Sequence, residues 1–194
     1  MKNKVKIAVF ASGNGSNFQA IADAVKAGSL DAEIVLVVTD RPNAYVIERA
    51  RQANIPSFAF IPADYDSKKS YEEMLKGKLE SLLVDWIVLA GFMRLIGSAL
   101  LEAYENRIVN IHPSVLPAFP GKDAIGQTMA AGAESAGVTV HFVDAGMDTG
   151  NIIVQESFEV NGRSREAVEK EIHAIEHRLY PAALQRLFNL NNMH

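Results

Sequence analysis

The sequence predicts an α/β fold: a doubly wound, mostly parallel sheet, with antiparallel strands and a long closing helix near the C-terminus. Over the first 110 residues, short apolar runs rich in β-branched residues alternate with segments of helical spacing. This alternation is typical of a parallel sheet with right-handed crossovers. Two later strand-like runs are joined by a turn-rich loop, which favours antiparallel pairing. No repeat or linker divides the chain, so we expect one domain over residues 1–194.

Composition narrows the class of protein. The 194 residues include 19 basic and 23 acidic side chains, a formal net charge of −4, which with the lack of a long basic run argues against a nucleic-acid partner. The absence of cysteine excludes disulfides and thiolate metal sites. The first apolar run is too short for a signal peptide or a membrane span. We therefore expect a cytoplasmic protein with one sizeable core.

The N-terminal half is expected to supply four parallel strands, over residues 5–11, 32–39, 57–61 and 85–90. Helical spacing separates them over residues 18–25 and 44–53, and again from about residue 70. Ser70 and Glu73 form a capping-box pattern near the start of that third helix. A short helix over residues 98–104 then leads to a further strand that ends near Asn110.

A glycine-rich turn, residues 12–17, lies between the first strand and the first helix. This geometry offers free backbone N–H groups and a positive dipole end to a phosphate. The turn lacks the third glycine of a dinucleotide fingerprint and the lysine of a P-loop. A single phosphate monoester is therefore favoured over a pyrophosphate. The alternative is an ordinary turn between strand and helix.

Residues 91–96 follow the fourth strand and place bulky apolar side chains around Arg94. They could line a pocket for an aromatic ligand or lead into the core, and the residues alone leave both open. Ligands in doubly wound sheets bind outside the carboxyl ends of the strands. Because residues 12–17, 91–96 and 110–114 all fall at such ends, we expect them to form one site.

Asn110 and His112 lie two residues apart at a strand end, so their side chains point to the same side. An amide N–H and an imidazolium N–H that converge on one point can stabilise a developing oxyanion. The alternative is a hydrogen-bonding asparagine cap beside a surface histidine. Two prolines, Pro113 and Pro117, prevent the following segment from becoming helical.

The C-terminal part is expected to hold a helix over residues 125–131 and strands over 138–143 and 152–160. The closing helix begins near Ser164 and is expected to break at Pro181. An acidic loop between the two strands carries Asp144 and Asp148. A carboxylate favours the charged form of a nearby imidazole, so Asp148 would keep His112 protonated. Its alternative role is that of a turn residue.

The residues exclude some chemistries. No pair of histidines has the sequence context of a zinc site, and there is neither a cysteine nor a G-x-S-x-G nucleophile elbow. What remains is acyl-type transfer to or from a phosphate-bearing ligand, without a covalent intermediate.

Four motifs in the chain resemble those of a known family. They are S-G-N-G-S-N at residues 12–17, G-F-M-R at 91–94, N-I-H-P-S-V-L-P at 110–117 and D-A-G-M-D-T-G at 144–150. In this order and spacing they resemble the folate-dependent formyltransferases, and the glycine loop narrows the resemblance to the phosphoribosylglycinamide formyltransferase family of purine biosynthesis. The resemblance covers essentially the whole chain.

The resemblance implies which residues bind two small-molecule substrates. Those that bind glycinamide ribonucleotide are Gly15, Ser16 and Asn17, at its phosphate, and Glu176. Those that bind the co-substrate 10-formyltetrahydrofolate are Lys68, Met93, Arg94, Leu95, Ile96, Asn110, Asp144 and Asp148. No metal, nucleic acid or membrane is implied, and a homodimer is left open.

The resemblance also implies a mechanism, in which the substrate amine attacks the formyl carbon directly. Asn110 and His112 would stabilise the oxyanion, and Asp148 would support protonated His112 and help relay protons through water. The chain departs from the family pattern in two places. Asp123 stands where some members carry histidine, and Asn151 stands where proline is frequent. We expect these departures to alter loop detail and to leave activity intact.

Three alternatives are weighed against this function. A formyltetrahydrofolate deformylase shares the Asn-His-Asp chemistry but usually carries an additional N-terminal domain, whereas this chain begins directly with the first strand. A methionyl-tRNA formyltransferase would need a further C-terminal domain to bind the RNA. A non-catalytic nucleotide-binding module would leave Asn110, His112 and Asp148 as accidental neighbours. The position of Lys68 is arginine in some relatives, which leaves its folate contact open.

Overall fold

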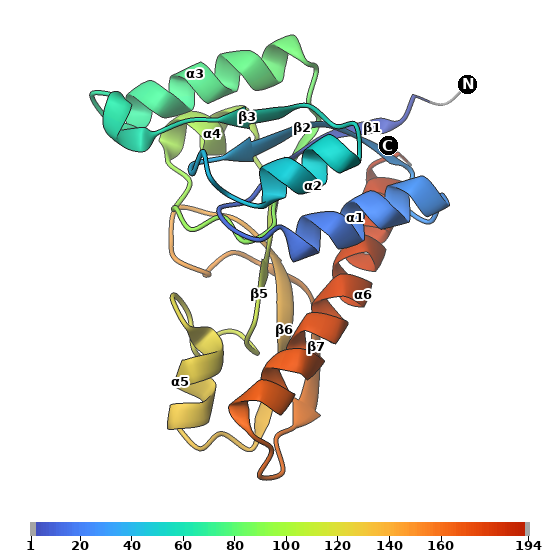
Figure 1. The fold of residues 1–194 in the computed structure, drawn as a ribbon, viewed down its shortest axis with the longest axis vertical. Coiled ribbons are helices and arrows are strands. Elements are labelled where there is room, and N and C mark those ends of the chain that lie inside the picture. The colour runs from blue at the N-terminus through green and yellow to red at the C-terminus, as the bar shows by residue number, and fades with distance from the viewer. Residues whose placement is uncertain (1–2, 193–194) are drawn as a thin grey trace.

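The computed structural model describes residues 3–192 and contains one seven-stranded sheet (Figure 1). Its strands, in the order β3-β2-β1-β4-β5-β6-β7, run parallel from β3 to β5, and β6 and β7 are antiparallel to their neighbours. The strands are β1 (Val5–Phe10), β2 (Ala32–Thr39), β3 (Ser57–Ala59), β4 (Trp86–Leu89), β5 (Ile108–His112), β6 (Ser135–Phe142) and β7 (Ile152–Glu159). The predicted mostly parallel sheet with antiparallel C-terminal strands is confirmed.

Helices cover both faces of the sheet, as the doubly wound prediction requires. They are α1 (Ser16–Ala27), α2 (Val46–Gln52), α3 (Lys68–Ser81), α4 (Ser98–Ala103), α5 (Ala124–Ala130) and α6 (Arg165–Asn191). One core cluster gathers apolar side chains of α1, α2, α5 and α6, and the other gathers those of α3 and α4. Figure 1 shows α3 on the opposite side of the strands from α1 and α2. None of the helices described in residues 3–192 is long and apolar enough to cross a membrane.

The central strands are buried on both faces, which explains their continuous apolar sequence. Ile7, Ala8, Val9 and Phe10 are all fully buried. The closing helix is tied to the same strands through Tyr180, whose hydroxyl donates to the Leu89 carbonyl oxygen at 2.7 Å. The long helix α6 is therefore fixed against the sheet beside the predicted site.

Two predicted helix details are wrong. Helix α6 continues through Pro181, because the apolar residues buried on both sides of it, Tyr180 and Leu184 among them, outweigh one lost backbone hydrogen bond. Helix α3 begins at Lys68, two residues before Ser70. Ser67 is its cap, and the Ser67 hydroxyl accepts from the Ser70 backbone N–H at 3.1 Å.

Candidate active site

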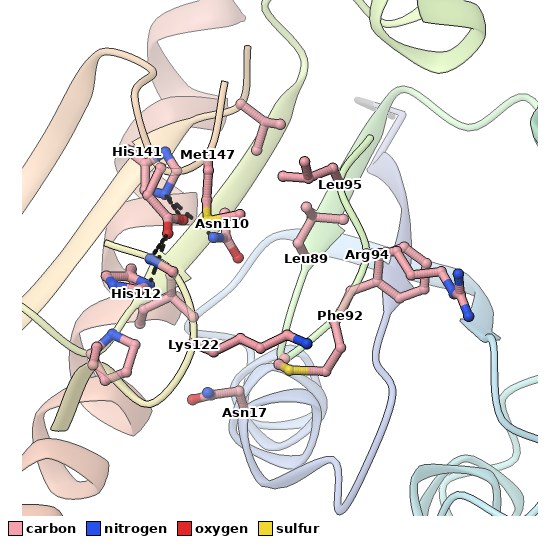
Figure 2. A pocket seen from close by; sticks show the side chains of 18 of the residues that line it. Asn17, Leu89, Phe92, Arg94, Leu95, Asn110, His112, Lys122, His141 and Met147 are labelled. Carbon is pink, nitrogen blue, oxygen red and sulfur yellow. Dashed lines mark hydrogen bonds and ion pairs between the residues drawn. The ribbon is translucent and has the colours of Figure 1, made fainter. Parts of the chain in front are cut away.

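A pocket of about 860 Å³ opens where strands β1, β4 and β5 end (Figure 2). The pocket is lined by the loops after these strands and after β2, the start of α1, the loop between β6 and β7, and the first half of α6. It brings together ten of the predicted site residues: Asn17, Met93, Arg94, Leu95, Ile96, Asn110, His112, Asp144, Asp148 and Glu176. These residues come from five segments that are distant in the sequence.

Three predicted site residues do not line this pocket. Gly15 and Ser16 lie at the start of α1, directly before the lining residue Asn17. Lys68 is the first residue of α3, where its charge acts on Glu72 one turn later. The structure therefore places Lys68 apart from the residues around His112.

His112, at the end of β5, is 6% exposed and is held through both ring nitrogens. Its Nδ1 lies 3.5 Å from Asp148 Oδ2, and its Nε2 lies 2.9 Å from the Phe119 carbonyl oxygen. Both neighbours are acceptors, so a ring that carries a proton on each nitrogen satisfies both contacts. These two contacts fix the orientation of the His112 ring at the end of β5.

Asp148 joins the acidic loop to two histidines. Its Oδ2 accepts from the Gly121 backbone N–H at 2.8 Å, and its Oδ1 lies 3.6 Å from His141 Nε2. Burial tends to raise the pKa of Asp148. The hydrogen bonds from His141 and Gly121 and the charge of His112 outweigh burial and hold that pKa below its ordinary value. Asp148 is therefore a carboxylate at neutral pH.

His141 is a member of this group that the sequence analysis did not assign to the site. It is 2% exposed and pairs with Asn110 in the antiparallel register of β5 and β6. Its Nε2 lies 3.3 Å from Asn110 Nδ2, and its Nδ1 lies 2.8 Å from the Phe142 carbonyl oxygen. A histidine inside an alternating apolar strand was the available signal, but only the strand register shows that it faces Asn110.

Gly15 in the glycine-rich turn caps α1 in the left-handed conformation, with φ 80°. A Cβ atom there would lie 2.6 Å from Val46 Cγ2, so the position requires glycine. Because the cap residue has no side chain, it leaves the first N–H groups of α1 to a ligand. Asn17 Nδ2 donates to Glu176 Oε2 at 2.7 Å, and Asn17 Oδ1 is buried without a hydrogen-bond partner among the described residues.

The segment after β4 is fixed by a polar network that the sequence analysis also missed. Asp40, 6% exposed at the end of β2, accepts from the Ser12 hydroxyl at 2.6 Å and from Arg94 Nε at 2.8 Å. The Met93 backbone N–H donates to Ser12 Oγ at 2.9 Å. In Figure 2 the Arg94 side chain points away from Asn110 and His112. Its guanidinium group is thus engaged by Asp40, while the apolar Met93 and Leu95 side chains stay half-exposed at the pocket.

The two departures from the family pattern lie in loops. Asp123 caps α5, accepts from the Gly126 N–H at 3.2 Å and pairs with Arg165 at 2.7 Å. The Asn151 carbonyl oxygen accepts from the Phe142 N–H at 2.9 Å. Within residues 3–192, no group of three or more His, Asp or Glu side chains is arranged to hold a metal ion.

Comparisons with known proteins agree with this geometry. Residues 5–184 match the family model described as "Formyl transferase". The chain is 52% identical to phosphoribosylglycinamide formyltransferase of Bacillus subtilis over 96% of each chain. It is 37% identical to the Escherichia coli enzyme of that name, over 93% of this chain and 85% of that protein. The crystal structure of glycinamide ribonucleotide transformylase 1 from Geobacillus kaustophilus superposes with a TM-score of 0.93 at 56% identity, covering 95% of this chain and 99% of that one. The chain therefore belongs to the formyl transferase family.

Proposed function

We propose that this enzyme transfers the formyl group of 10-formyltetrahydrofolate to the amine of glycinamide ribonucleotide, a step of purine biosynthesis. The observation that carries the proposal is the meeting of Asn110, His112 and Asp148 in one pocket. It is supported by the match to phosphoribosylglycinamide formyltransferases over nearly the whole chain.

The ribonucleotide is proposed to bind between the start of α1 and the first half of α6. Its phosphate would accept hydrogen bonds from the backbone N–H groups of Gly15, Ser16 and Asn17, at the positive end of the α1 dipole. Glu176 is 5% exposed and already accepts from Asn17, so its carboxylate is held rigidly at the pocket wall. There it would accept hydrogen bonds from the polar groups of the ribonucleotide.

The folate is proposed to occupy the side of the pocket formed by residues 93–96 and 144–148. About 860 Å³ is within the usual range for a pocket that encloses a ligand of this size. Met93 and Leu95 are 57% and 46% exposed, and an aromatic pterin would bury their apolar surfaces. The bound folate supplies the formyl group, attached to its N10 nitrogen.

The catalytic residues would act on the charge that develops during attack by the amine. As the amine approaches the formyl carbon, negative charge builds on the formyl oxygen, and Asn110 Nδ2 and the His112 imidazolium would donate to it. Asp148 would keep His112 charged and oriented. Since the Phe119 carbonyl is a neutral acceptor and Asp148 is charged, the Phe119 contact is the one we expect His112 to exchange for the oxyanion.

The test is a spectroscopic assay of folate deformylation with and without glycinamide ribonucleotide. Turnover that requires the ribonucleotide supports the proposal, and ribonucleotide-independent release of formate indicates a deformylase. His112→Ala should lose most turnover while still binding the ribonucleotide. A cytoplasmic location and a homodimer remain predictions, which fractionation of cells and analytical ultracentrifugation test.

A further inference from the structure

We propose that Arg49 of helix α2 is a positioning residue that holds the glycine-rich turn in the conformation that binds phosphate. This inference rests on the proposed function, because it takes the phosphate of the ribonucleotide to lie at the start of α1. Arg49 itself does not line the pocket, so its effect is exerted through the turn.

Arg49 ties three segments together through one guanidinium group. Its Nε donates to the Asn14 carbonyl oxygen at 2.8 Å, and its Nη2 donates to Asn14 Oδ1 at 2.7 Å. Its Nη1 donates to Gln19 Oε1 on α1 at 3.3 Å. The guanidinium carbon also lies 5.1 Å from the centre of the Tyr45 ring, a cation–π distance. The charged group is thus held in one orientation from several sides.

Helix α2 fixes two successive peptide planes of the turn. Its first backbone N–H, that of Val46, donates to the Gly13 carbonyl oxygen at 3.1 Å, and Arg49 engages the next carbonyl, that of Asn14. In a trans peptide the carbonyl and the following N–H point in opposite directions. The N–H groups of Asn14 and Gly15 therefore point away from α2.

These directed N–H groups continue into the first turn of α1. Gly15 has φ 80° and ψ 24°, and the residues that follow it are helical. A left-handed residue beside right-handed ones turns successive N–H groups into a concavity that binds anions. Holding the Asn14 carbonyl in place therefore keeps the anion-binding N–H groups aligned before the ligand arrives, which reduces the ordering cost of binding.

Arginine suits this task better than lysine does. Two of its N–H groups reach the backbone and side-chain oxygens of the same residue, Asn14, and a lysine ammonium cannot reproduce this planar fork. Arg51 offers a matched control two residues later. It donates to Glu48 of the same helix at 2.9 and 2.6 Å, and it makes no hydrogen bond or ion pair with residues 12–17, all of which the structure describes.

The experiment compares the steady-state kinetics of Arg49→Ala, Arg49→Lys and Arg51→Ala with those of the unmodified enzyme. Losing the paired contacts to Asn14 should raise KM for the ribonucleotide about tenfold, while kcat and KM for the folate stay within about twofold. The ribonucleotide KM of Arg49→Lys should lie between that of Arg49→Ala and that of the unmodified enzyme. The ribonucleotide KM of Arg51→Ala should equal that of the unmodified enzyme. Calorimetric titration with the ribonucleotide alone should show the same loss of affinity.

A second variant separates positioning from general stability. Asn14→Ala removes one acceptor of the fork, so it should raise KM for the ribonucleotide by less than Arg49→Ala. The double variant should be no worse than Arg49→Ala alone. If the ribonucleotide KM of Arg49→Ala matches that of Arg51→Ala, or if kcat falls with KM unchanged, the inference is wrong. If the unmodified enzyme shows no ribonucleotide-dependent transfer, the proposed function fails instead.

Discussion

Replacing Asp148 by asparagine removes one negative charge from the centre of the site and leaves its shape in place. Asparagine tolerates the left-handed backbone at this position, where φ is 55°, and it can still accept from the Gly121 N–H. Asp148 Oδ2 lies 3.5 Å from His112 Nδ1. For unit charges at that distance, an effective dielectric constant of about 20 gives about 5 kcal/mol. The dipole of the new amide and nearby water replace part of this attraction. We therefore expect the variant to lose about 3–4 kcal/mol of transition-state stabilisation.

That loss corresponds to a kcat roughly 10²- to 10³-fold lower, because each 1.36 kcal/mol is about tenfold in rate. The assay is ribonucleotide-dependent formyl transfer at saturating concentrations of both substrates. Asp123→Asn is the matched control: Asp123 also has a left-handed backbone, with φ 50°, and lines the same pocket, but its carboxylate pairs with Arg165 and not with His112. The control should keep turnover within about twofold. If Asp148→Asn is as active as the control, Asp148 does not support the charge on His112.

Three further predictions concern stability, measured by urea unfolding. Gly15→Ala should lower the free energy of unfolding by about 2–3 kcal/mol, because the added Cβ would lie 2.6 Å from Val46 Cγ2. Gly28→Ala, where φ is similar but the space around the Cβ position is open, should lower it by about 1 kcal/mol. Tyr180→Phe should lower the free energy of unfolding by about 1–3 kcal/mol, because the carbonyl oxygens of Leu89 and Val109 lose the buried hydroxyl that donates to them. Burial raises the pKa of Glu72, so its contribution to stability is present at low pH and is lost as pH rises through that pKa. The free energy of unfolding of Glu72→Gln should therefore rise relative to that of the unmodified protein as the pH rises above the ordinary pKa of a glutamate, and a pH-independent difference would contradict this.

Much of the fold could be predicted because it depends on local patterns. Continuous apolar runs mark the buried central strands, and the turn-rich loop before Ile152 marks the antiparallel pair. The break predicted at Pro181 shows where local rules fail. Proline removes one hydrogen bond, but the buried residues on both sides of it are held by the sheet, and no local pattern records that packing.

The site could be predicted in part for the same reason. Asn110 and His112 share one strand end, so their common direction follows from the strand period. His141 and Asp40 depend on contacts between distant strands, and their sequence surroundings carry no motif that points to these partners. Lys68 does not line the pocket, so its contact with the folate stays a prediction that rests on the family resemblance.

The most direct test of the account follows the formyl carbon itself. The enzyme is given 10-formyltetrahydrofolate labelled with ¹³C in the formyl group, together with glycinamide ribonucleotide, and the products are separated by mass. We predict that the label appears on the ribonucleotide amine, one equivalent for each folate consumed, and that it is absent from free formate. Label that accumulates as formate while the ribonucleotide stays unmodified would contradict the proposal that Asn110, His112 and Asp148 direct the formyl group to the amine.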